Sequence, residues 1–426
     1  MSTSEPRRCE SCKQVYPNVS GIQCLIRDPA GFVRAALDRV TSYRLVTSER
    51  AQALLLEARG SQVSEKTRRR LERLANGLLA EGQCLEILFM PLRETLAAHP
   101  SPLGALASLL DDPGTAAQYW EHVFRDWVWG EAENARTRGL LQPYLGEPIG
   151  VLAVFGAGTA RLAFDLSQHP LIDEVVALDT NPLPFLVADR LLSGSTVELV
   201  EFPLVPLTID HVAIPRRIEP PPAASSKLSL VFADALQAPF ADGALDAVVT
   251  PWFIDAVAAE LSEVTAEINR VLRPGGLWLN VGPLYYSGSP FHAYSFEEVC
   301  ELVRASGFEL LGQHAEALPY FDSPVSGTCR NDRTYVFAAR KVAPAPPVAA
   351  RARAAPWLDN PTLPVPVSAT LAASVQRSVV TAGIGQLVDG ARSLSDITRI
   401  LSESWGVPPD VLLPKIQAFL SRNTEL

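Results

Sequence analysis

Residues 149–164 read I-G-V-L-A-V-F-G-A-G-T-A-R-L-A-F. The apolar run 151–155 predicts a buried parallel strand, after which Gly156 and Gly158 turn the chain into a helix that we expect to begin near Arg161. Glycine allows the backbone to approach a ligand closely, and the amides at the start of a helix face it. The stretch therefore predicts a loop that binds a nucleotide cofactor, with an ordinary strand-turn-helix as the alternative.

The spacing of the loop indicates which cofactor it takes. The dinucleotide fingerprint GxGxxG requires a third glycine where this chain has Arg161, so hydride chemistry is disfavoured. Rossmann-like enzymes that use S-adenosylmethionine prefer a glycine one residue earlier, and Ala160 is the smallest substitute there. We therefore expect S-adenosylmethionine, held by Gly156, Ala157 and Gly158.

Further strands follow in the order of an α/β fold. Residues 175–178 predict a second strand closed by Asp179, where a carboxylate can accept both ribose hydroxyls. Residues 228–233 predict a third strand, and Asp234, followed by Ala235, is placed to meet the adenine amine. Residues 245–250 and 277–281 predict a fourth and a fifth strand on either side of a helix over 258–272. The alternative for an acid at a strand end is a helix cap.

Composition excludes several classes of protein. The chain has 426 residues, of which 47% are hydrophobic and 20% charged, as in soluble globular proteins. A net charge of −10 argues against a nucleic-acid partner. No apolar run approaches the roughly 20 residues of a membrane span, and no signal-peptide core is present. The six cysteines form no disulfide framework, so we expect a cytoplasmic protein.

The segments on either side of this α/β region differ from it. Residues 1–28 are expected to form a short β module, in which Cys9 and Cys12 have zinc-knuckle spacing and Cys24 is a third thiolate. A fourth ligand is missing, so a structural zinc and a metal-free β-ribbon docked on the next domain both remain open. Residues 29–118 predict a helical scaffold, 119–342 the cofactor-binding domain, 343–366 a Pro/Ala linker and 367–426 a small helical domain.

Residues 119–133, Y-W-E-H-V-F-R-D-W-V-W-G-E-A-E, are dense in aromatic side chains. One interpretation is a helix that packs Trp120, Phe124 and Trp127 on the core. Arg125 is costly to bury unpaired, and the carboxylate of a methionine-derived cofactor is a bidentate partner for its guanidinium.

Several of these motifs together resemble the carnosine N-methyltransferase family. They are Arg125-Asp126-Trp127, the loop at 155–164, Trp252-Phe253-Ile254-Asp255 and the stretch 279–286, L-N-V-G-P-L-Y-Y. The resemblance implies a Rossmann-like seven-stranded methyltransferase sheet, whose last pair, near 308–313 and 333–340, is antiparallel. It also implies that S-adenosylmethionine is held by Arg125, Gly156, Gly158, Asp179, Asp234 and Ala235.

The same resemblance implies an acceptor site. Asp255 is expected to bind the imidazole whose ring nitrogen is methylated, with Trp252, Tyr286 and Ser287 as further substrate-binding residues. The family has a histidine where this chain has Ser287, and a run of tyrosines where it reads Cys329-Arg330-Asn331-Asp332-Arg333. We therefore expect an N-methyltransferase that methylates an imidazole nitrogen of a histidine-containing small molecule or peptide, and a different imidazole from that of carnosine fits these departures. The alternatives are a methyltransferase acting on a precursor peptide or another nucleophile, and a non-catalytic scaffold.

Two smaller resemblances concern the ends of the chain. Residues 1–28 resemble the zinc-ribbon-like module that activates RNA and protein methyltransferases. Residues 367–426 resemble PqqD-like winged-helix modules, which implies a leader peptide as partner. A docking or dimerisation appendage is the alternative for this second segment.

Overall fold

The structure, a computed structural model, describes residues 7–10, 13–98, 119–222, 226–257, 259–286, 293–347, 357, 360–367 and 379–423. The chain divides into two compact units. The first comprises Met1–Arg27, Tyr43–Pro91 and Ala117–Val348, and the second comprises Asp28–Ser42, Leu92–Ala116 and Ala349–Leu426. The predicted Ser287 and Cys12 lie outside the described residues.

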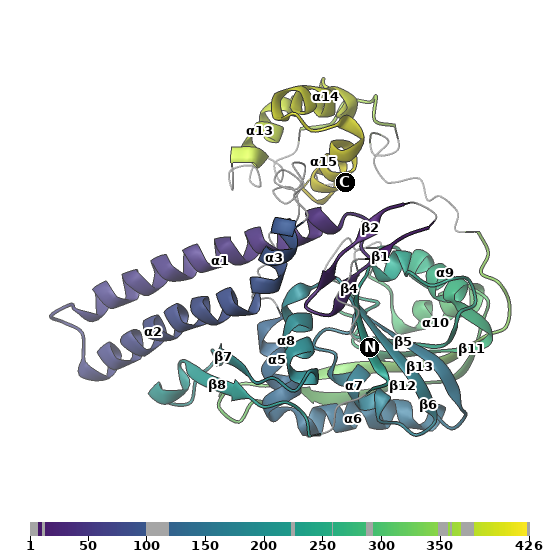
Figure 1. Ribbon diagram of the computed structural model, residues 1–426, viewed down its shortest axis with the longest axis horizontal. Coiled ribbons are helices and arrows are strands. Elements are labelled where there is room, and N and C mark those ends of the chain that lie inside the picture. Colours follow the sequence, from purple (N-terminus) through teal and green to yellow (C-terminus); the bar gives the residue numbers. More distant parts are fainter. Residues whose placement is uncertain are drawn as a thin grey trace. The chain divides into compact units, whose positions relative to one another are not determined.

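A nine-stranded sheet forms the centre of the first unit (Figure 1). Its order is β12 (Phe308–Tyr320), β13 (Arg330–Lys341), β11 (Leu272–Gly282), β10 (Leu245–Pro251), β5 (Ile149–Phe155), β6 (Ile172–Asp179), β9 (Leu228–Phe232), β4 (Ile22–Cys24) and β3 (Asn18–Val19). The five strands from β11 to β9 are parallel, and β13 and β12 form an antiparallel edge. This order confirms the predicted α/β fold and its seven methyltransferase-type strands, to which β4 and β3 add two.

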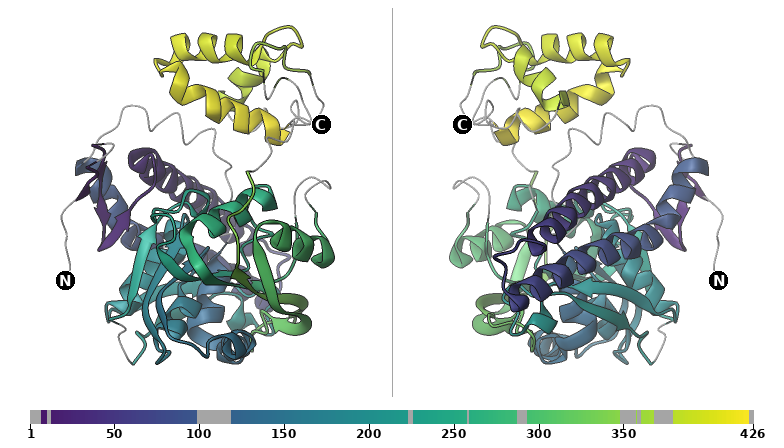
Figure 2. Two further views of the ribbon diagram at one scale, coloured as in Figure 1. Left: turned by 90° about the vertical axis from the view of Figure 1, so that its right-hand side faces the viewer. Right: turned by 90° about the vertical axis from the view of Figure 1, so that its left-hand side faces the viewer.

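Helices cover both faces of this sheet (Figures 1 and 2). On one side lie α9 (Leu261–Val271) and α10 (Phe296–Ala305), and on the other α6 (Glu131–Leu141) and α7 (Arg161–Ser167). After β6 comes α8 (Pro182–Leu192). The buried faces of α9 and α10 join the apolar side chains of β10 and β11 in one core. This core holds the carboxyl ends of the parallel strands in place.

The boundary between α9 and β11 differs from the prediction. The helix begins at Leu261 rather than at 258, and β11 begins at Leu272 rather than at 277. The pairing with β10 slips at this point, because Leu245 faces Leu272 whereas Ala247 faces Leu277. The stretch 273–276, R-P-G-G, is thus an irregularity within the strand, and no apolar alternation marks it in the sequence.

The aromatic-dense segment forms a helix interrupted by a π-helical turn. α5 (Trp120–Phe124) leads into the π-helix η1 (Arg125–Trp129), which ends at Gly130 before α6. The Gly130 amide donates to the Arg125 carbonyl at 2.7 Å, and a Cβ at Gly130 would lie 2.3 Å from that oxygen. Trp120 and Phe124 are buried as predicted, and Trp127 is half-buried.

The N-terminal segment is joined to the sheet. β1 (Arg7–Arg8) and β2 (Val15–Tyr16) form a separate antiparallel pair, while β4 pairs in parallel with β9. The Leu25 amide continues this pairing to the Phe232 carbonyl at 2.8 Å, and the Ser20 hydroxyl donates to Asp189 at 3.0 Å. These contacts join the segment to the predicted cofactor-binding domain, whereas the region next to it in the sequence is the helical one. A metal-free ribbon stays a prediction.

The helical region predicted over 29–118 contains three described helices. They are α1 (Pro29–Ala58), α2 (Glu65–Leu88) and α3 (Met90–Ala98). Within the first unit, the part of α1 after residue 42 packs against α2 around Ala51, Ala75 and Leu78. The segment before β9 contains β7 (Val197–Glu201) and β8 (Ile214–Ile218), which pair as an antiparallel hairpin.

The described C-terminal residues of the second unit form three helices. They are α13 (Val379–Leu387), α14 (Leu394–Trp405) and α15 (Pro409–Asn423). Their core includes Trp357 and Val365, which belong to the predicted linker. α14 begins with a capping box between Ser393 and Asp396. The winged-helix resemblance of this segment stays a prediction.

Candidate active site

A cavity of about 290 Å³ lies where the parallel strands of the first unit end. The loop after β5, the last residue of β6, the segment after β9 and the last residue of β10 all contribute to its wall. The chain leaves β5 toward β6 on one side and reaches β10 on the other, so the cavity lies at the point where the strand order reverses. Open α/β sheets bind ligands at this position.

The glycine-rich loop depends on left-handed backbone at three positions. Gly156, Gly158 and Ala160 have φ angles of +66°, +56° and +57°. A Cβ at Gly156 would lie 2.5 Å from the Phe253 ring, whereas a Cβ at Gly158 would meet nothing within 4 Å. Gly156 is therefore required by packing, while Gly158 leaves backbone open toward the cavity.

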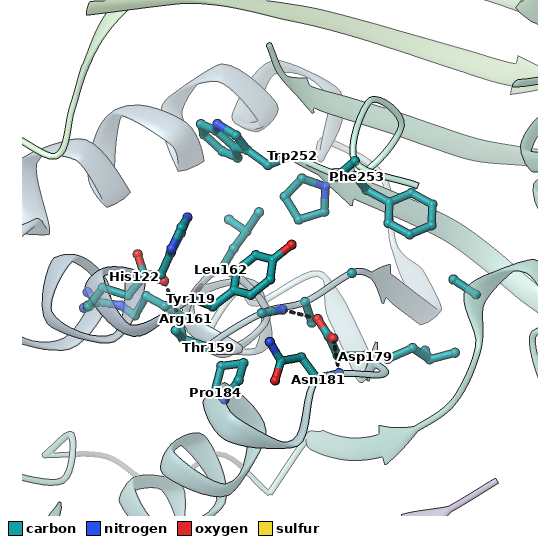
Figure 3. Close-up of a pocket in the computed structure, with 18 of the residues that line it drawn as sticks. Tyr119, His122, Thr159, Arg161, Leu162, Asp179, Asn181, Pro184, Trp252 and Phe253 are labelled. Carbon is teal, nitrogen blue, oxygen red and sulfur yellow. Dashed lines mark hydrogen bonds between the residues drawn. The ribbon is translucent and has the colours of Figure 1, made fainter. Parts of the chain in front are cut away.

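Asp179 fixes this loop from the end of β6. Its two carboxylate oxygens accept the amides of Gly158 and Asn181, each at 2.7 Å (Figure 3). Burial raises the pKa of Asp179 to about 6, although these amide bonds oppose the shift. The carboxylate is thus positioned by the backbone and lines the cavity.

Asp234 and Ala235 lie on the same wall after β9. The Asp234 carboxylate caps the short helix η4 (Ala235–Gln237) by accepting the Leu236 amide at 2.9 Å. The cap predicted as the alternative for such an acid is therefore present, and the side chain also lines the cavity. A carboxylate that is already held by a backbone amide needs little rearrangement to accept a ligand donor.

Arg125 reaches the cavity from the π-helix and is paired within the protein. Its Nε and Nη2 lie 2.7 Å from Asp126 Oδ1, and both side chains are largely buried. Burial lowers the pKa of Arg125, but the Asp126 carboxylate outweighs this effect and raises the pKa above its ordinary value. The other Asp126 oxygen accepts the Thr159 hydroxyl, so the same carboxylate ties the π-helix to the glycine-rich loop.

Tyr320, at the end of β12, is the centre of an aromatic wall. The Trp252 ring stacks on it at 5.6 Å between centroids, and the Arg125 guanidinium lies 4.7 Å from its ring centre. Its hydroxyl is 3.1 Å from His122 Nε2. Burial and then the Arg125 charge lower the pKa of His122 to about 3, so this ring is neutral. In Figure 3, Trp252 and Phe253 face Asp179, Asn181 and Pro184 across the cavity.

Asp255 and Tyr286 are not among the residues that line the cavity, although Phe253 and Ala256, the neighbours of Asp255 in the chain, are. The Asp255 carboxylate accepts the Tyr285 amide at 2.8 Å, and burial raises its pKa. Burial, and after it the charge of Asp255, raises the pKa of Tyr286. Tyr119, which does line the cavity, has its pKa raised by burial and then by Asp179 and Asp255.

Most of the predicted site residues meet in this one cavity. Its wall includes Arg125, Gly156, Ala157, Gly158, Asp179, Asp234, Ala235 and Trp252. The predicted thiolates are elsewhere: Cys9 follows β1, and Cys24 is buried in β4. Within the described residues, no group of three or more His, Cys, Asp or Glu side chains is able to hold a metal ion. The structure thus provides no support for zinc.

The sequence did not identify several further residues that line the cavity, among them Asn181, Thr159, His122 and Tyr320. Asn181, Thr159 and His122 are near predicted residues in the chain, whereas Tyr320 comes from a distant element. His122 stands three residues before Arg125, and this spacing was the only available signal. No motif surrounds Tyr320, which the pairing of β12 with β13 brings to the cavity.

The residues of the cavity fit S-adenosylmethionine. Asp179 and Asp234 are carboxylates held by backbone amides, which suits the hydroxyl and amine donors of an adenosine group. Gly158 leaves the space that a Cβ would fill. Arg125 supplies a cation for a carboxylate at the aromatic wall.

Residues 202–337 match the model of the carnosine N-methyltransferase family. The match begins at the residue that follows β7, ends within β13 and leaves out the glycine-rich loop. Together with the strand order, it supports an S-adenosylmethionine-dependent methyltransferase. The comparison with curated protein sequences finds no match.

Similar solved structures include three methyltransferases. An S-adenosylmethionine-dependent methyltransferase from Methanosarcina mazei is 16% identical, with 48% of this chain and 97% of that chain covered and a TM-score of 0.34. A putative methyltransferase from Bacillus halodurans is 17% identical, with 49% of this chain and 100% of that chain covered and a TM-score of 0.34. A putative sarcosine dimethylglycine methyltransferase from Galdieria sulphuraria is 12% identical, with 53% of this chain and 98% of that chain covered and a TM-score of 0.37.

Among the described residues, no helix is both long enough and apolar enough to cross a membrane.

Proposed function

We propose that the protein is an S-adenosylmethionine-dependent N-methyltransferase that methylates an imidazole nitrogen of a histidine-containing small molecule or peptide. The observation that carries this proposal is the placement of Asp255. Its carboxylate, three residues after cavity-lining Trp252, accepts the Tyr285 amide at 2.8 Å. This bond joins the two segments on which the resemblance of the acceptor site rests, 252–255 and 279–286.

S-adenosylmethionine, when bound, supplies an already activated methyl group. Asp179 and Asp234 would hold its adenosine part, and Arg125 its carboxylate. The protein must then position the acceptor nitrogen and exclude water. The aromatic side chains of Trp252, Phe253 and Tyr320, of which the last two are buried, suit the second task.

An imidazole acceptor needs no strong base, because its pKa of about 6.5 leaves it largely neutral at pH 7. Asp255 would accept the N–H of the nitrogen that does not react, which fixes the tautomer and stabilises the positive charge that develops on the ring. The Tyr285 amide holds this carboxylate in one orientation. Burial raises the pKa of Asp255 and favours its taking up the proton after transfer.

The test is mass spectrometry of reactions with S-adenosylmethionine and a panel of histidine, carnosine and histidine-containing peptides. A charge-assisted hydrogen bond contributes about 1.5–3 kcal/mol, so Asp255→Asn should lower turnover by about 10- to 100-fold. Its affinity for S-adenosylhomocysteine should stay unchanged, since Asp255 does not line the cavity. Asp173→Asn, at an exposed position of β6, is the matched control.

Methylation of an imidazole that disappears in Asp255→Asn would support both the reaction and the role of this residue. Full turnover in Asp255→Asn would refute that role. Binding of S-adenosylhomocysteine without methylation of any member of the panel would refute these acceptors and favour a different nucleophile.

A further inference from the structure

Trp252 has an unusual backbone conformation for a large residue. Its φ angle is +46°, in the left-handed region that side chains other than glycine rarely adopt. The surroundings hold it there: its amide donates to the Val281 carbonyl at 2.8 Å, and a Cβ at Gly282 would lie 2.9 Å from its N and Cα atoms. Strained residues that the surrounding structure maintains in this way concentrate at ligand sites.

The indole nitrogen of Trp252 provides a second, independent observation. Among the described residues, it is a buried polar atom with no hydrogen-bond partner. An indole N–H is only a donor, so its missing partner is an acceptor atom. The ring lines the cavity and stacks on Tyr320 with an angle of 20° between the rings.

The charges near Trp252 restrict the chemistry of the hydrogen-bond acceptor that its indole N–H would contact. The Arg125 guanidinium lies 5.7 Å from the Trp252 ring centre, which favours an anionic oxygen. The carboxylates of Asp179 and Asp234 also line the cavity, and Asp126 and Asp165 already pair with Arg125 and Arg161. A group with two negative charges, such as phosphate, is therefore disfavoured, whereas a singly charged planar group is suited to the site.

We propose that the Trp252 indole N–H, beside the Arg125 guanidinium, binds a carboxylate that one of the two ligands of this cavity carries. This inference rests on the proposed function and makes it more specific. The carboxylate belongs either to the amino-acid end of the cofactor or to an acceptor with the structure of an α-amino acid. In both cases Trp252 determines specificity through one hydrogen bond.

The experiment measures binding by calorimetry in the full chain and in Trp252→Phe, which keeps an aromatic ring for stacking on Tyr320 and removes the N–H. Two ligand pairs differ in the carboxylate. In the first pair, S-adenosylhomocysteine carries a carboxylate and 5′-methylthioadenosine does not. In the second pair, histidine carries a carboxylate and histamine does not. The second pair is measured with protein saturated with S-adenosylhomocysteine. We expect Trp252→Phe to weaken the binding of the carboxylate-bearing ligand of one pair by about 10- to 100-fold. The binding of the other ligand of that pair should weaken by less than about twofold.

The pair that responds identifies which ligand carries the carboxylate. Trp129→Phe is the matched control, because its indole N–H donates to Glu201 at 3.1 Å and its ring does not line the cavity. This variant should affect neither pair. If Trp252→Phe changes both members of each pair equally, or changes none, the proposal is wrong.

Two outcomes separate this proposal from the proposed function. Failure of the wild-type protein to bind S-adenosylhomocysteine would refute both. Normal binding with no selectivity for the carboxylate would refute the role of Trp252 alone. If Trp252→Phe does not fold, the indole N–H resonance of Trp252 in the wild-type protein decides: it should shift with S-adenosylhomocysteine or histidine and stay in place with the ligands that lack the carboxylate.

Discussion

Asp179 is the residue at which burial and ligand binding are in conflict. Its pKa is raised to about 6 because it is buried, and a ribose hydroxyl would donate only to its ionised form efficiently. The affinity for S-adenosylhomocysteine should therefore be constant above pH 7 and decrease as the pH falls through 6. At pH 5 we expect binding about tenfold weaker than at pH 8, measured by calorimetry.

The control for this pH dependence is Asp179→Asn. The amide does not titrate, so this variant should bind weakly at pH 8 and show the same affinity at pH 5. His122 does not interfere, because its pKa of about 3 keeps it neutral throughout this range. Equal affinities of the wild-type protein at both pH values would contradict the role of Asp179.

The sequence predicted those site residues that carry a local signal. Gly156 and Gly158 are recognisable because a nucleotide loop requires glycine, and Asp179 and Asp234 because each follows an apolar strand. Tyr320 has no such signal, since its position depends on the antiparallel pairing of β12 with β13. The same holds for the unpaired indole nitrogen of Trp252, which results from the packing around it.

The π-helix η1 contains one largely buried ion pair, between Arg125 and Asp126. Asp126→Ala would leave the Arg125 guanidinium buried, with a side-chain exposure of 12%, and without its carboxylate. We expect the free energy of unfolding to fall by about 3–5 kcal/mol, measured by urea denaturation. The loss should include the Thr159 contact to the glycine-rich loop.

A double-variant cycle isolates the contribution of this pair. Arg125→Met combined with Asp126→Ala should lose less than the sum of the two single variants, because the second substitution removes the unpaired charge. The exposed pair Arg68–Glu65, at 3.6 Å, is the control and should contribute about 0–1 kcal/mol. Additive losses at Arg125 and Asp126 would show that the pair does not stabilise this turn.

Elements with a strong apolar period were predicted well, and elements formed by pairing were not. The parallel strands β5, β6, β9 and β10 stand out as apolar runs. β8 reads I-P-R-R-I, with a proline and two arginines, and is a strand only because it pairs with β7. β3 and β4 have two and three residues, too few to show any period, and β4 is held by its pairing with β9.

At the scale of the whole molecule, the cofactor site and the C-terminal helices belong to different units. Every residue that lines the cavity lies between Tyr119 and Tyr320, within the first unit. The apolar core of α13 to α15 consists of residues between Trp357 and Leu420. The Pro/Ala composition predicts a linker between the two regions. The second unit, however, also contains Asp28–Ser42 and Leu92–Ala116, and Trp357 and Val365 of the predicted linker pack in the C-terminal core.

A chain that ends at Val348 should therefore keep the cofactor affinity of the full chain. We expect its dissociation constant for S-adenosylhomocysteine to stay within about twofold, because no cavity-lining side chain is removed. If residues 367–426 bind a leader peptide, as their resemblance implies, the shortened chain should require a higher concentration of a leader-bearing peptide acceptor while its turnover of free histidine is unchanged. A parallel loss of cofactor affinity would show instead that the removed helices support the methyltransferase fold, and would contradict the separation of function between the two units.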